Sequence, residues 1–255
     1  MIRCFESDDI QNVNPNIDPI RDLEIIETEM KLADLESIQK RLDKKNKKNL
    51  SEKEVNILET ALDCINNDKS IEQTLHQNYS KKELHLTGLL STKSKLFVCN
   101  VDEKSISEGN NYTKKFISKF GEKNTILISA DIENQINQLE NQEKINYMKM
   151  INLKETGLNT LIKKGYKLLE LETFFTSGPE ESRAWTVPIN CTAPKAAGII
   201  HTDFEKGFIR AETVSYKEFI LNNGWLNSKN NGKMRLEGKD YIVKDGDVLN
   251  FRFNT

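Results

Sequence analysis

Two short apolar runs separated by a helical segment constrain the fold of this chain more than any other feature. Residues 95–99 (KLFVC) and 125–128 (TILI) each have the length of one buried strand. The residues between them predict a helix at about 112–120, and a further helix is predicted over 132–150. Residues 1–5 (MIRCF) predict another short strand. Strand and helix alternating in this way indicate a parallel sheet with crossover helices, so an α/β domain is predicted.

A helical region is predicted ahead of the first of these apolar runs. Asp18 and Pro19 form a favourable N-cap and first-turn pair, and apolar residues follow at spacings of three and four. Capping-box patterns at 51–54 (SEKE) and 80–83 (SKKE) open two further helices. The first two helices are joined by a short polar turn, so we expect them to form an antiparallel hairpin.

From Leu171 onward the pattern changes to short strands and turns. This C-terminal stretch predicts a compact α+β module, which is a plausible size for a small domain. Its strand candidates are residues 185–189, 208–214, 240–243 and 248–251, and its helix candidates are residues 195–204 and 216–222.

Composition narrows the classes of protein that this chain can belong to. Its 255 residues suffice for two or three small domains. A net charge of −2 gives no overall basic field for nucleic acid, and no apolar run approaches the length of a membrane-spanning helix. The N-terminus has no secretory signal pattern, and the widely spaced cysteines predict buried, reduced thiols. We therefore expect a cytoplasmic protein with no membrane partner and no zinc site; the cysteines are Cys4, Cys64, Cys99 and Cys191.

Polar residues follow both apolar runs of the predicted parallel sheet. Ligands of α/β domains bind at the carboxyl ends of the strands, where Asn100 and the pair Ser129–Ala130 lie. An Asn side chain offers one acceptor and two donors, so it can read a purine edge with two hydrogen bonds. The backbone amide after Ser129 could contact a ring acceptor in the same way. From the residues alone, Asn100 fits an Asx-turn or a helix cap better than a base contact.

The segment Asn100-Val101-Asp102-Glu103 resembles the altered G4 motif of the YchF/Obg-like ATPase family. Ordinary GTPases carry N-K-x-D there, and the Asp accepts two N–H groups of guanine. The family's departure accompanies a preference for ATP over GTP, which implies that Asn100 contacts adenine and that Val101 gives the ring an apolar surface. Residues 129–133 (SADIE) resemble the family's G5 loop. The implied base-binding residues are Asn100, Val101, Glu103, Ser129 and Ala130.

The resemblance covers essentially the whole chain and is weaker in the helical region. Residues 201–211 (HTDFEKGFIRA) and 237–247 (EGKDYIVKDGD) resemble the family's TGS domain most specifically. The implied organisation has three parts. These are a partial nucleotide-binding G domain at 1–17 and 92–169, an inserted helical coiled-coil domain at 18–91, and a β-grasp-like TGS domain at 170–255.

The phosphate-binding part of the family pattern is absent from these residues. No G-x-x-x-x-G-K-[ST] loop occurs, and neither do the switch segments and D-x-x-G loop that follow it in the family. That loop holds the phosphates through its backbone N–H groups and lysine, and it holds Mg²⁺ through its Ser or Thr. The resemblance therefore implies an N-terminally truncated member with no catalytic residue or metal ligand. We expect ATP binding to be weak or absent, Mg²⁺ to serve only the full-length family, and this chain alone to hydrolyse no ATP.

A TGS domain is a binding module for RNA or ribosomal protein, so the resemblance implies the ribosome or ribosomal RNA as partner. Basic side chains in this part of the sequence form a candidate contact face, although Glu205, Glu212 and Glu237 lie among them and scattered solvated charge fits as well. His201 also fits a residue that braces a turn. The candidate contacts are Lys195, His201, Lys206 and Arg210, with Lys233 and Arg235 beside them. At the helical tip, Lys44, Lys45, Lys47 and Lys48 fit either RNA contact or a solvated turn.

Three functional hypotheses stay open at this point. The chain is a remnant of an Obg-like ATPase that keeps its base-recognition motifs and TGS domain. Alternatively, it is a ribosome- or RNA-binding TGS module that works without nucleotide. In the third hypothesis it is one half of a split ATPase, completed by a separate N-terminal chain.

Overall fold

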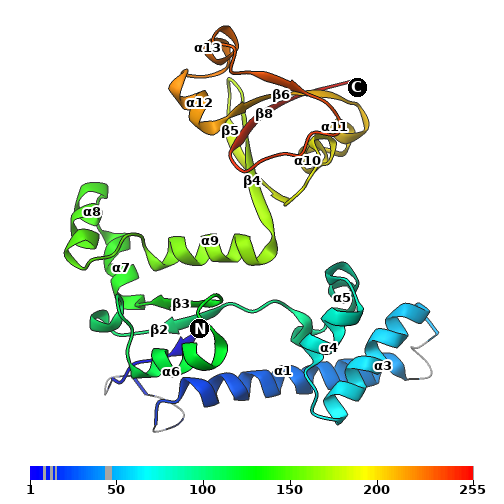
Figure 1. Cartoon of the computed structure of the whole chain (residues 1–255), viewed down its shortest axis with the longest axis vertical. Helices are drawn as coiled ribbons and strands as arrows, with labels where there is room; N and C mark the ends of the chain where they lie inside the picture. The colour runs from blue at the N-terminus through cyan, green and yellow to red at the C-terminus, as the bar shows by residue number, and fades with distance from the viewer. Residues whose placement is uncertain (8–9, 12–13, 15, 44–47, 255) are drawn as a thin grey trace. The chain divides into compact units, whose positions relative to one another are not determined.

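The computed structural model describes residues 1–7, 10–11, 14, 16–43 and 48–254, and the chain divides into two compact units (Figure 1). The first unit spans Met1–Ile162 and the second spans Lys163–Thr255. The sheet and the helical region that were expected as separate domains both lie in the first unit. The boundary between the units falls within helix α9 (Gly157–Leu169), whereas the predicted boundary lay at its end.

A three-stranded parallel sheet organises the first unit, as the alternation of strands and helices predicted. Its order is β1 (Ile2–Arg3), β2 (Phe97–Asn100) and β3 (Thr125–Ile128). Phe97 lies opposite Thr125 and Asn100 lies opposite Ile128, so β2 and β3 end at the same edge. Helix α6 (Asn111–Phe120) connects these two strands, after the short 3₁₀ turn η2 (Glu103–Ser105). Two strands with one crossover helix thus place the two polar strand ends side by side.

The helix predicted over 132–150 is two helices. Helix α7 (Ala130–Gln138) and helix α8 (Asn141–Met150) are separated by Leu139 and Glu140, which both have extended backbone angles. The sequence at this point has no glycine or proline to mark the break. No residue of α8 is buried, so packing does not anchor this helix as it anchors α7.

A buried cluster behind β2 holds the sheet against α6. Cys99 and Phe116 are fully buried, and Phe116 makes edge-on contact with Phe97 at 5.6 Å between ring centroids. Cys4 lies in the same cluster, and its thiol contacts that of Cys99. This hydrogen bond, together with burial, raises the pKa of Cys4. All four cysteines are buried and free.

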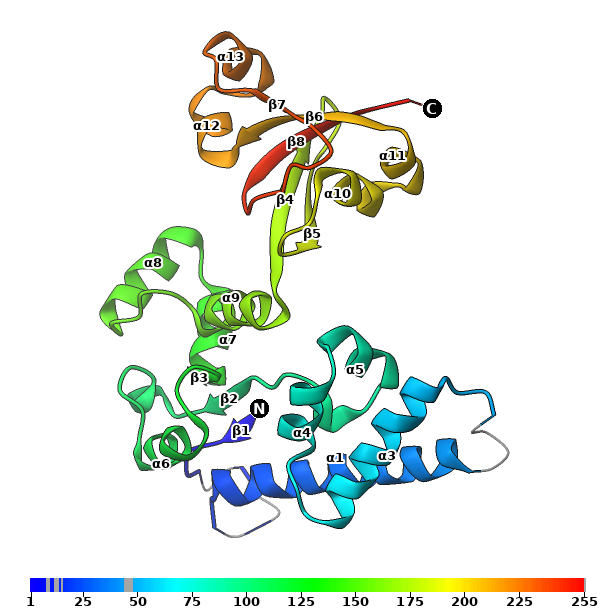
Figure 2. The same cartoon turned by 45° about the vertical axis from the view of Figure 1, so that its right-hand side comes forward.

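The helical region comprises α1 (Pro19–Leu42), α3 (Glu52–Asn66), α4 (Ile71–Asn78), α5 (Lys81–Thr87) and the 3₁₀ turn η1 (Leu90–Thr92). The predicted caps are present: Asp18 accepts hydrogen bonds from the first turn of α1, and capping boxes begin α3 and α5. Helix α4 was not predicted. Ile38 of α1 packs in one buried cluster with Ile57 and Leu58 of α3, so the first two long helices lie together (Figure 2).

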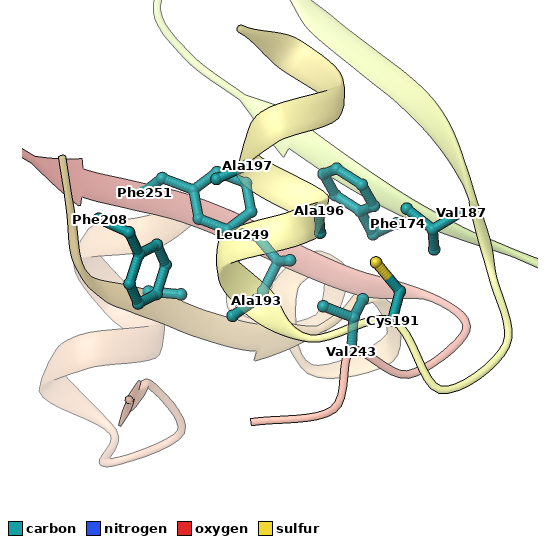
Figure 3. Close-up of a cluster of buried hydrophobic side chains, with 11 residues drawn as sticks. Phe174, Val187, Cys191, Ala193, Ala196, Ala197, Phe208, Val243, Leu249 and Phe251 are labelled. Atoms are coloured by element: carbon teal, nitrogen blue, oxygen red, sulfur yellow. The ribbon is translucent and has the colours of Figure 1, made fainter. Parts of the chain in front are cut away.

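The second unit is built on a five-stranded sheet in the order β5-β4-β8-β6-β7. Its strands are β4 (Leu171–Ser177), β5 (Ser182–Pro188), β6 (Phe208–Ser215), β7 (Arg235–Glu237) and β8 (Asp247–Phe253). The helices are α10 (Ala193–Ile200), α11 (Thr202–Lys206), α12 (Tyr216–Leu221) and α13 (Trp225–Asn230). Small residues of α10 lie over Phe174, Leu249 and Phe251 of the sheet, which form the core of this unit (Figure 3).

Two sequence-based assignments in this unit were wrong. Residues 240–243 form no strand in the described structure and make only an isolated bridge between Ile242 and Thr192. The helix predicted over 195–204 is interrupted at His201, whose extended backbone separates α10 from α11. Helix α13 and strands β4 and β7 were not predicted. No helix in the described ranges is both long and apolar enough to span a membrane.

Candidate base-recognition site

The candidate site lies at the edge of the first sheet where β2 and β3 end. Asn100 is the last residue of β2, and Ser129 and Ala130 directly follow β3. The Asn100 carboxamide oxygen accepts a hydrogen bond from the Ala130 backbone N–H at 3.0 Å. Because an N–H group is a donor, the atom that faces it is the oxygen, and this contact determines the orientation of the carboxamide. The structure therefore brings together the two segments that the sequence singled out.

This hydrogen bond changes what each group offers to a ligand. The sequence suggested that Asn100 reads a purine with one acceptor and one donor, and that the amide after Ser129 binds a ring acceptor. In the structure, the Asn100 acceptor and the Ala130 N–H satisfy each other. What Asn100 still presents is its Nδ2 group, a donor that suits an acceptor such as purine N7.

Val101 does not give the site an apolar surface, so that expectation was wrong. Its side chain is 2% exposed and packs in the cluster that contains Cys99 and Phe116. Its backbone N–H donates to the Ile128 carbonyl at 2.8 Å and extends the pairing of β2 with β3. A residue one position after Asn100 faces the opposite side of the strand, which here is the buried side.

Glu103 is linked to two residues of the following helices by a short chain of side-chain hydrogen bonds. Its Oε1 accepts a hydrogen bond from Gln135 Nε2 at 2.7 Å, and Gln135 Oε1 in turn accepts one from the Tyr147 hydroxyl. The three residues come from η2, α7 and α8. Sequence reasoning missed Gln135 and Tyr147, because their meeting depends on the break between α7 and α8, for which the sequence has no local signal.

Ser129 is buried, with 1% of its surface exposed. Its hydroxyl has no hydrogen-bond partner among the described residues, and it does not cap α7 even though it occupies the N-cap position. The Ser129 side chain is thus a buried polar group directly after β3, whereas Ala130 is exposed.

Glu133 connects this edge to the start of α9. Its Oε1 accepts a hydrogen bond from the Gly157 backbone N–H at 2.6 Å. A Cβ atom at position 157 would lie 2.8 Å from Cγ1 of Ile128, the last residue of β3. Glycine is therefore required where α9 begins against the sheet.

The basic residues proposed for RNA contact are exposed in the second unit, although acidic side chains lie close to them. Lys195, Lys206 and Arg210 are all solvent-exposed. His201 is the N-cap of α11: its Nδ1 accepts from the Asp203 backbone N–H at 3.2 Å. Arg235 pairs with Glu237 at 3.0 Å, and Lys233 pairs with Glu218 at 3.6 Å. Lys44, Lys45 and Lys47 of the expected helical tip lie outside the described residues.

Known proteins are similar to this chain over its whole length. A protein of Haemophilus ducreyi named "Ribosome-binding ATPase YchF" is 43% identical over 264 residues, which cover 100% of this chain and 72% of that protein. This chain belongs to the YchF family. A Bacillus subtilis protein of the same name is 41% identical with the same coverage of both chains. The family model YchF-GTPase_C, described as "Protein of unknown function (DUF933)", matches residues 171–254, which is nearly all of the second unit.

Solved structures agree with this family assignment. The Schizosaccharomyces pombe YchF GTPase matches with a TM-score of 0.77 and 28% identity, covering 98% of this chain and 70% of that one. A Pyrococcus horikoshii GTP-binding protein matches with a TM-score of 0.59 and 18% identity, covering 94% of this chain and 73% of that one, and shows a similar fold. The mixed α/β architecture is therefore one that YchF structures share.

Proposed function

We propose that this chain keeps the base-reading edge of a nucleotide site, joined to a ribosome-binding module, and that these 255 residues alone do not hydrolyse ATP. The observation that carries the first part is the hydrogen bond between Asn100 Oδ1 and the Ala130 N–H. It holds the carboxamide so that Nδ2 is left to donate to a purine. The site residues of this proposal are Asn100, Glu103, Ser129 and Ala130.

The preference for ATP over GTP follows in this proposal from the position of Glu103. Both purines present an N7 acceptor, so Asn100 Nδ2 by itself does not distinguish them. Guanine additionally needs an acceptor for its N1–H and N2–H groups. The carboxylate that would supply it, Glu103, is engaged by Gln135. Guanine therefore competes with Gln135 for this carboxylate, whereas adenine has no N1–H and makes no such demand on Glu103.

The residues present do not fit a catalytic phosphate and magnesium site. The sequence has no G-x-x-x-x-G-K-[ST] loop, and the described residues contain no group of three or more His, Cys, Asp or Glu side chains that could hold a metal ion. In phosphoryl transfer the phosphate clamp and the metal provide most of the catalysis, so base contacts alone leave the reaction uncatalysed.

Protein NMR tests the base site directly. Adenosine added to the purified chain should shift the backbone amide signals of residues 100 and 129–130, and guanosine should shift them less. Asn100→Asp keeps the acceptor for Ala130 and loses the Nδ2 donor, so this variant should show no such shifts while its spectrum stays folded. Equal shifts with both nucleosides would contradict the proposed selectivity.

Hydrolysis is tested separately from base binding. ATP should bind no more than a few-fold more tightly than adenosine, and phosphate release should match a buffer control. Release above that control would overturn the proposed inactivity. Release that appears only after a separately made N-terminal portion of a YchF relative is added would favour the split-enzyme alternative.

For the second unit we propose a TGS domain with a β-grasp-like fold that associates with the ribosome without nucleotide, which would place the protein in the cytoplasm. The relatives' name supports this, and so do the exposed basic residues Lys195, His201, Lys206 and Arg210. Co-sedimentation with ribosomes provides the test. Replacing both Lys195 and Lys206 by Glu should release the chain at lower salt, whereas Lys229→Glu on α13 should not. Absence from ribosomal fractions at low salt would refute the association.

A further inference from the structure

The sheet of the second unit opens between two of its central strands. Strand β8 pairs with β6 along its whole length, but with β4 only where Val248 lies opposite Phe175. Beyond that point the β4–β5 hairpin turns back at residues 178–181, while β8 continues to Phe253 (Figure 2). The backbone of residues 249–253 therefore has no strand partner on its β4 side among the described residues. Unpaired strand edges of this kind accept an added strand.

A groove lies on each face of the sheet at this opening. One has a volume of about 590 Å³ and is walled by α12 and α13 through Phe219, Ile220 and Trp225. The other has a volume of about 480 Å³ and lies on the α10 side, where Phe253 and Phe204 line it. Both grooves share Asn250 and the hairpin residues 177–179. Successive side chains of a strand point to opposite faces, so a strand in the opening would fill both grooves.

Two tryptophans give these grooves fixed walls. Trp185 donates from Nε1 to Thr176 Oγ1 at 2.8 Å and lines the α10-side groove. Trp225 donates from Nε1 to the Ser177 carbonyl at 2.8 Å and lines the other groove. With their only polar atoms already bonded, the two rings offer apolar surface, although the Arg183 guanidinium lies over the Trp185 ring at 4.3 Å from its centroid.

The rim of the α10-side groove is acidic. Glu180 and Glu181 line it at the hairpin tip, both are exposed, and neither has an ion-pair partner among the described residues. Two free carboxylates attract a cationic side chain and repel the phosphates of a nucleic acid. The chemistry of this opening thus favours a basic polypeptide over RNA.

We propose that a partner protein inserts an extended basic segment into this opening. Its backbone pairs with the free edge of β8, and its apolar side chains enter the two grooves alternately. A Lys or Arg of the segment lies against Glu180 and Glu181. This inference depends on the second unit alone and requires neither the nucleotide proposal nor the ribosome proposal.

Intrinsic fluorescence provides a readout, because Trp185 and Trp225 are the only tryptophans in the chain and one lines each groove. The probe is a synthetic peptide with a short apolar run flanked by lysines. We expect a saturable fluorescence change in the intact chain and in both single variants, Trp185→Phe and Trp225→Phe. No saturable change in any of the three would overturn the proposal.

Two altered peptides test the mode of binding. Methylating alternate backbone nitrogens removes strand pairing and should weaken binding at least tenfold. Replacing the lysines by glutamates should abolish saturation, and Glu180→Gln with Glu181→Gln in the chain should weaken binding of the lysine peptide roughly two- to fivefold per charge. An N-methylated peptide that binds equally well would refute strand addition. Displacement of the lysine peptide by an oligouridylate would indicate an RNA site instead.

Two exposed glycines allow a variant that blocks the grooves and a matched control. Gly178 lies in both groove walls, and an added Cβ there would have only an ordinary contact at 3.8 Å with the Glu181 carbonyl. Gly178→Phe should therefore fold normally and weaken binding of the peptide at least tenfold. Gly238 is equally open and lines neither groove, so Gly238→Phe should leave binding unchanged. Equal binding to both variants would contradict the proposed location.

Discussion

The Asn100 carboxamide joins the end of β2 to the start of α7 through one hydrogen bond, and this contact decides which hydrogen-bonding group the side chain can offer to a ligand. Its oxygen is bound to the Ala130 N–H, which leaves the amide nitrogen as the donor of this side chain. The same side chain is thus a structural brace and a candidate base contact. Substitutions can separate the two roles because Asp retains the acceptor and Ala retains neither group.

Asn100→Ala should lower the free energy of unfolding by about 1 kcal/mol, because the Ala130 N–H loses its partner. Asn100→Asp should lie closer to the unaltered chain, since its carboxylate still accepts that hydrogen bond. Urea unfolding of the three proteins measures the difference. Equal losses in both variants would show that the brace contributes nothing to stability.

Glu83 is a residue whose ionisation the local structure controls. The Lys53 ammonium and the Ser80 capping groups lower the pKa of its carboxyl to about 2 from the ordinary 4.5. A lowered pKa means that this stabilisation is complete above pH 4.5 and is lost as the pH falls towards 2. NMR titration of the Glu83 carboxyl should show a midpoint well below 4.5. Lys53→Met should move that midpoint upward, and an unchanged midpoint would rule out the ion pair as its main cause.

At the scale of elements, the contact between α1 and η1 depends on one buried carboxylate. Asp34 is 2% exposed, and its two oxygens accept from the backbone N–H groups of Leu90 and Ser91, each at 2.8 Å. Arg41 adds a hydrogen bond to the Thr87 carbonyl at 2.6 Å. The bonded residues lie 46 to 57 positions apart in the sequence. The contacts therefore hold the end of the helical region against its first helix.

Asp34→Ala should destabilise the first unit by about 1–3 kcal/mol, since two buried N–H groups lose their acceptor. Glu36→Gln, an exposed change on the same helix, should leave stability within about 0.5 kcal/mol of the original. Thermal and urea unfolding followed by circular dichroism compare the two. A similar small effect from both would mean that the Asp34 contacts are not needed.

At the scale of the whole molecule, each compact unit has hydrophobic clusters of its own. Phe174 is fully buried in the second unit, and Leu58 is fully buried in the helical region of the first. Among the described residues, no buried cluster contains residues from both units. Independent cores are a reason to expect more than one unfolding transition, in which case a single free energy would not describe the chain.

Phe174→Ala should therefore lower the free energy of unfolding of the second unit by about 3–5 kcal/mol, and the unfolding transition of the first unit should not change. Leu58→Ala should lower the free energy of unfolding of the first unit by about 2–5 kcal/mol and leave the transition of the second unit unchanged. Differential scanning calorimetry of the three proteins measures both transitions. A single transition that both variants lower equally would show that the units unfold as one.

Local spacing in the sequence was enough to predict most helices and the parallel sheet. Asp18, Pro19 and the two capping boxes mark helix starts because their partners lie within three residues. The apolar runs mark β2 and β3 because a buried strand needs only a few consecutive apolar residues. The break between α7 and α8 was missed for the converse reason, since extended angles at Leu139 and Glu140 follow from no local residue preference.

By itself, then, the sequence determined the order of the elements, the motif N-V-D-E at the end of a strand, and the absence of a phosphate loop from these residues. Only the tertiary structure decided that the Asn100 oxygen accepts a hydrogen bond from Ala130 and that Val101 is buried. It also decided that β8 has no strand partner among the described residues on its β4 side beyond Val248. The physical reason is distance along the chain. Caps and periodicity act within a few residues, whereas a hydrogen bond between a strand end and a remote helix start, or an opening in a sheet, exists only after remote segments have packed.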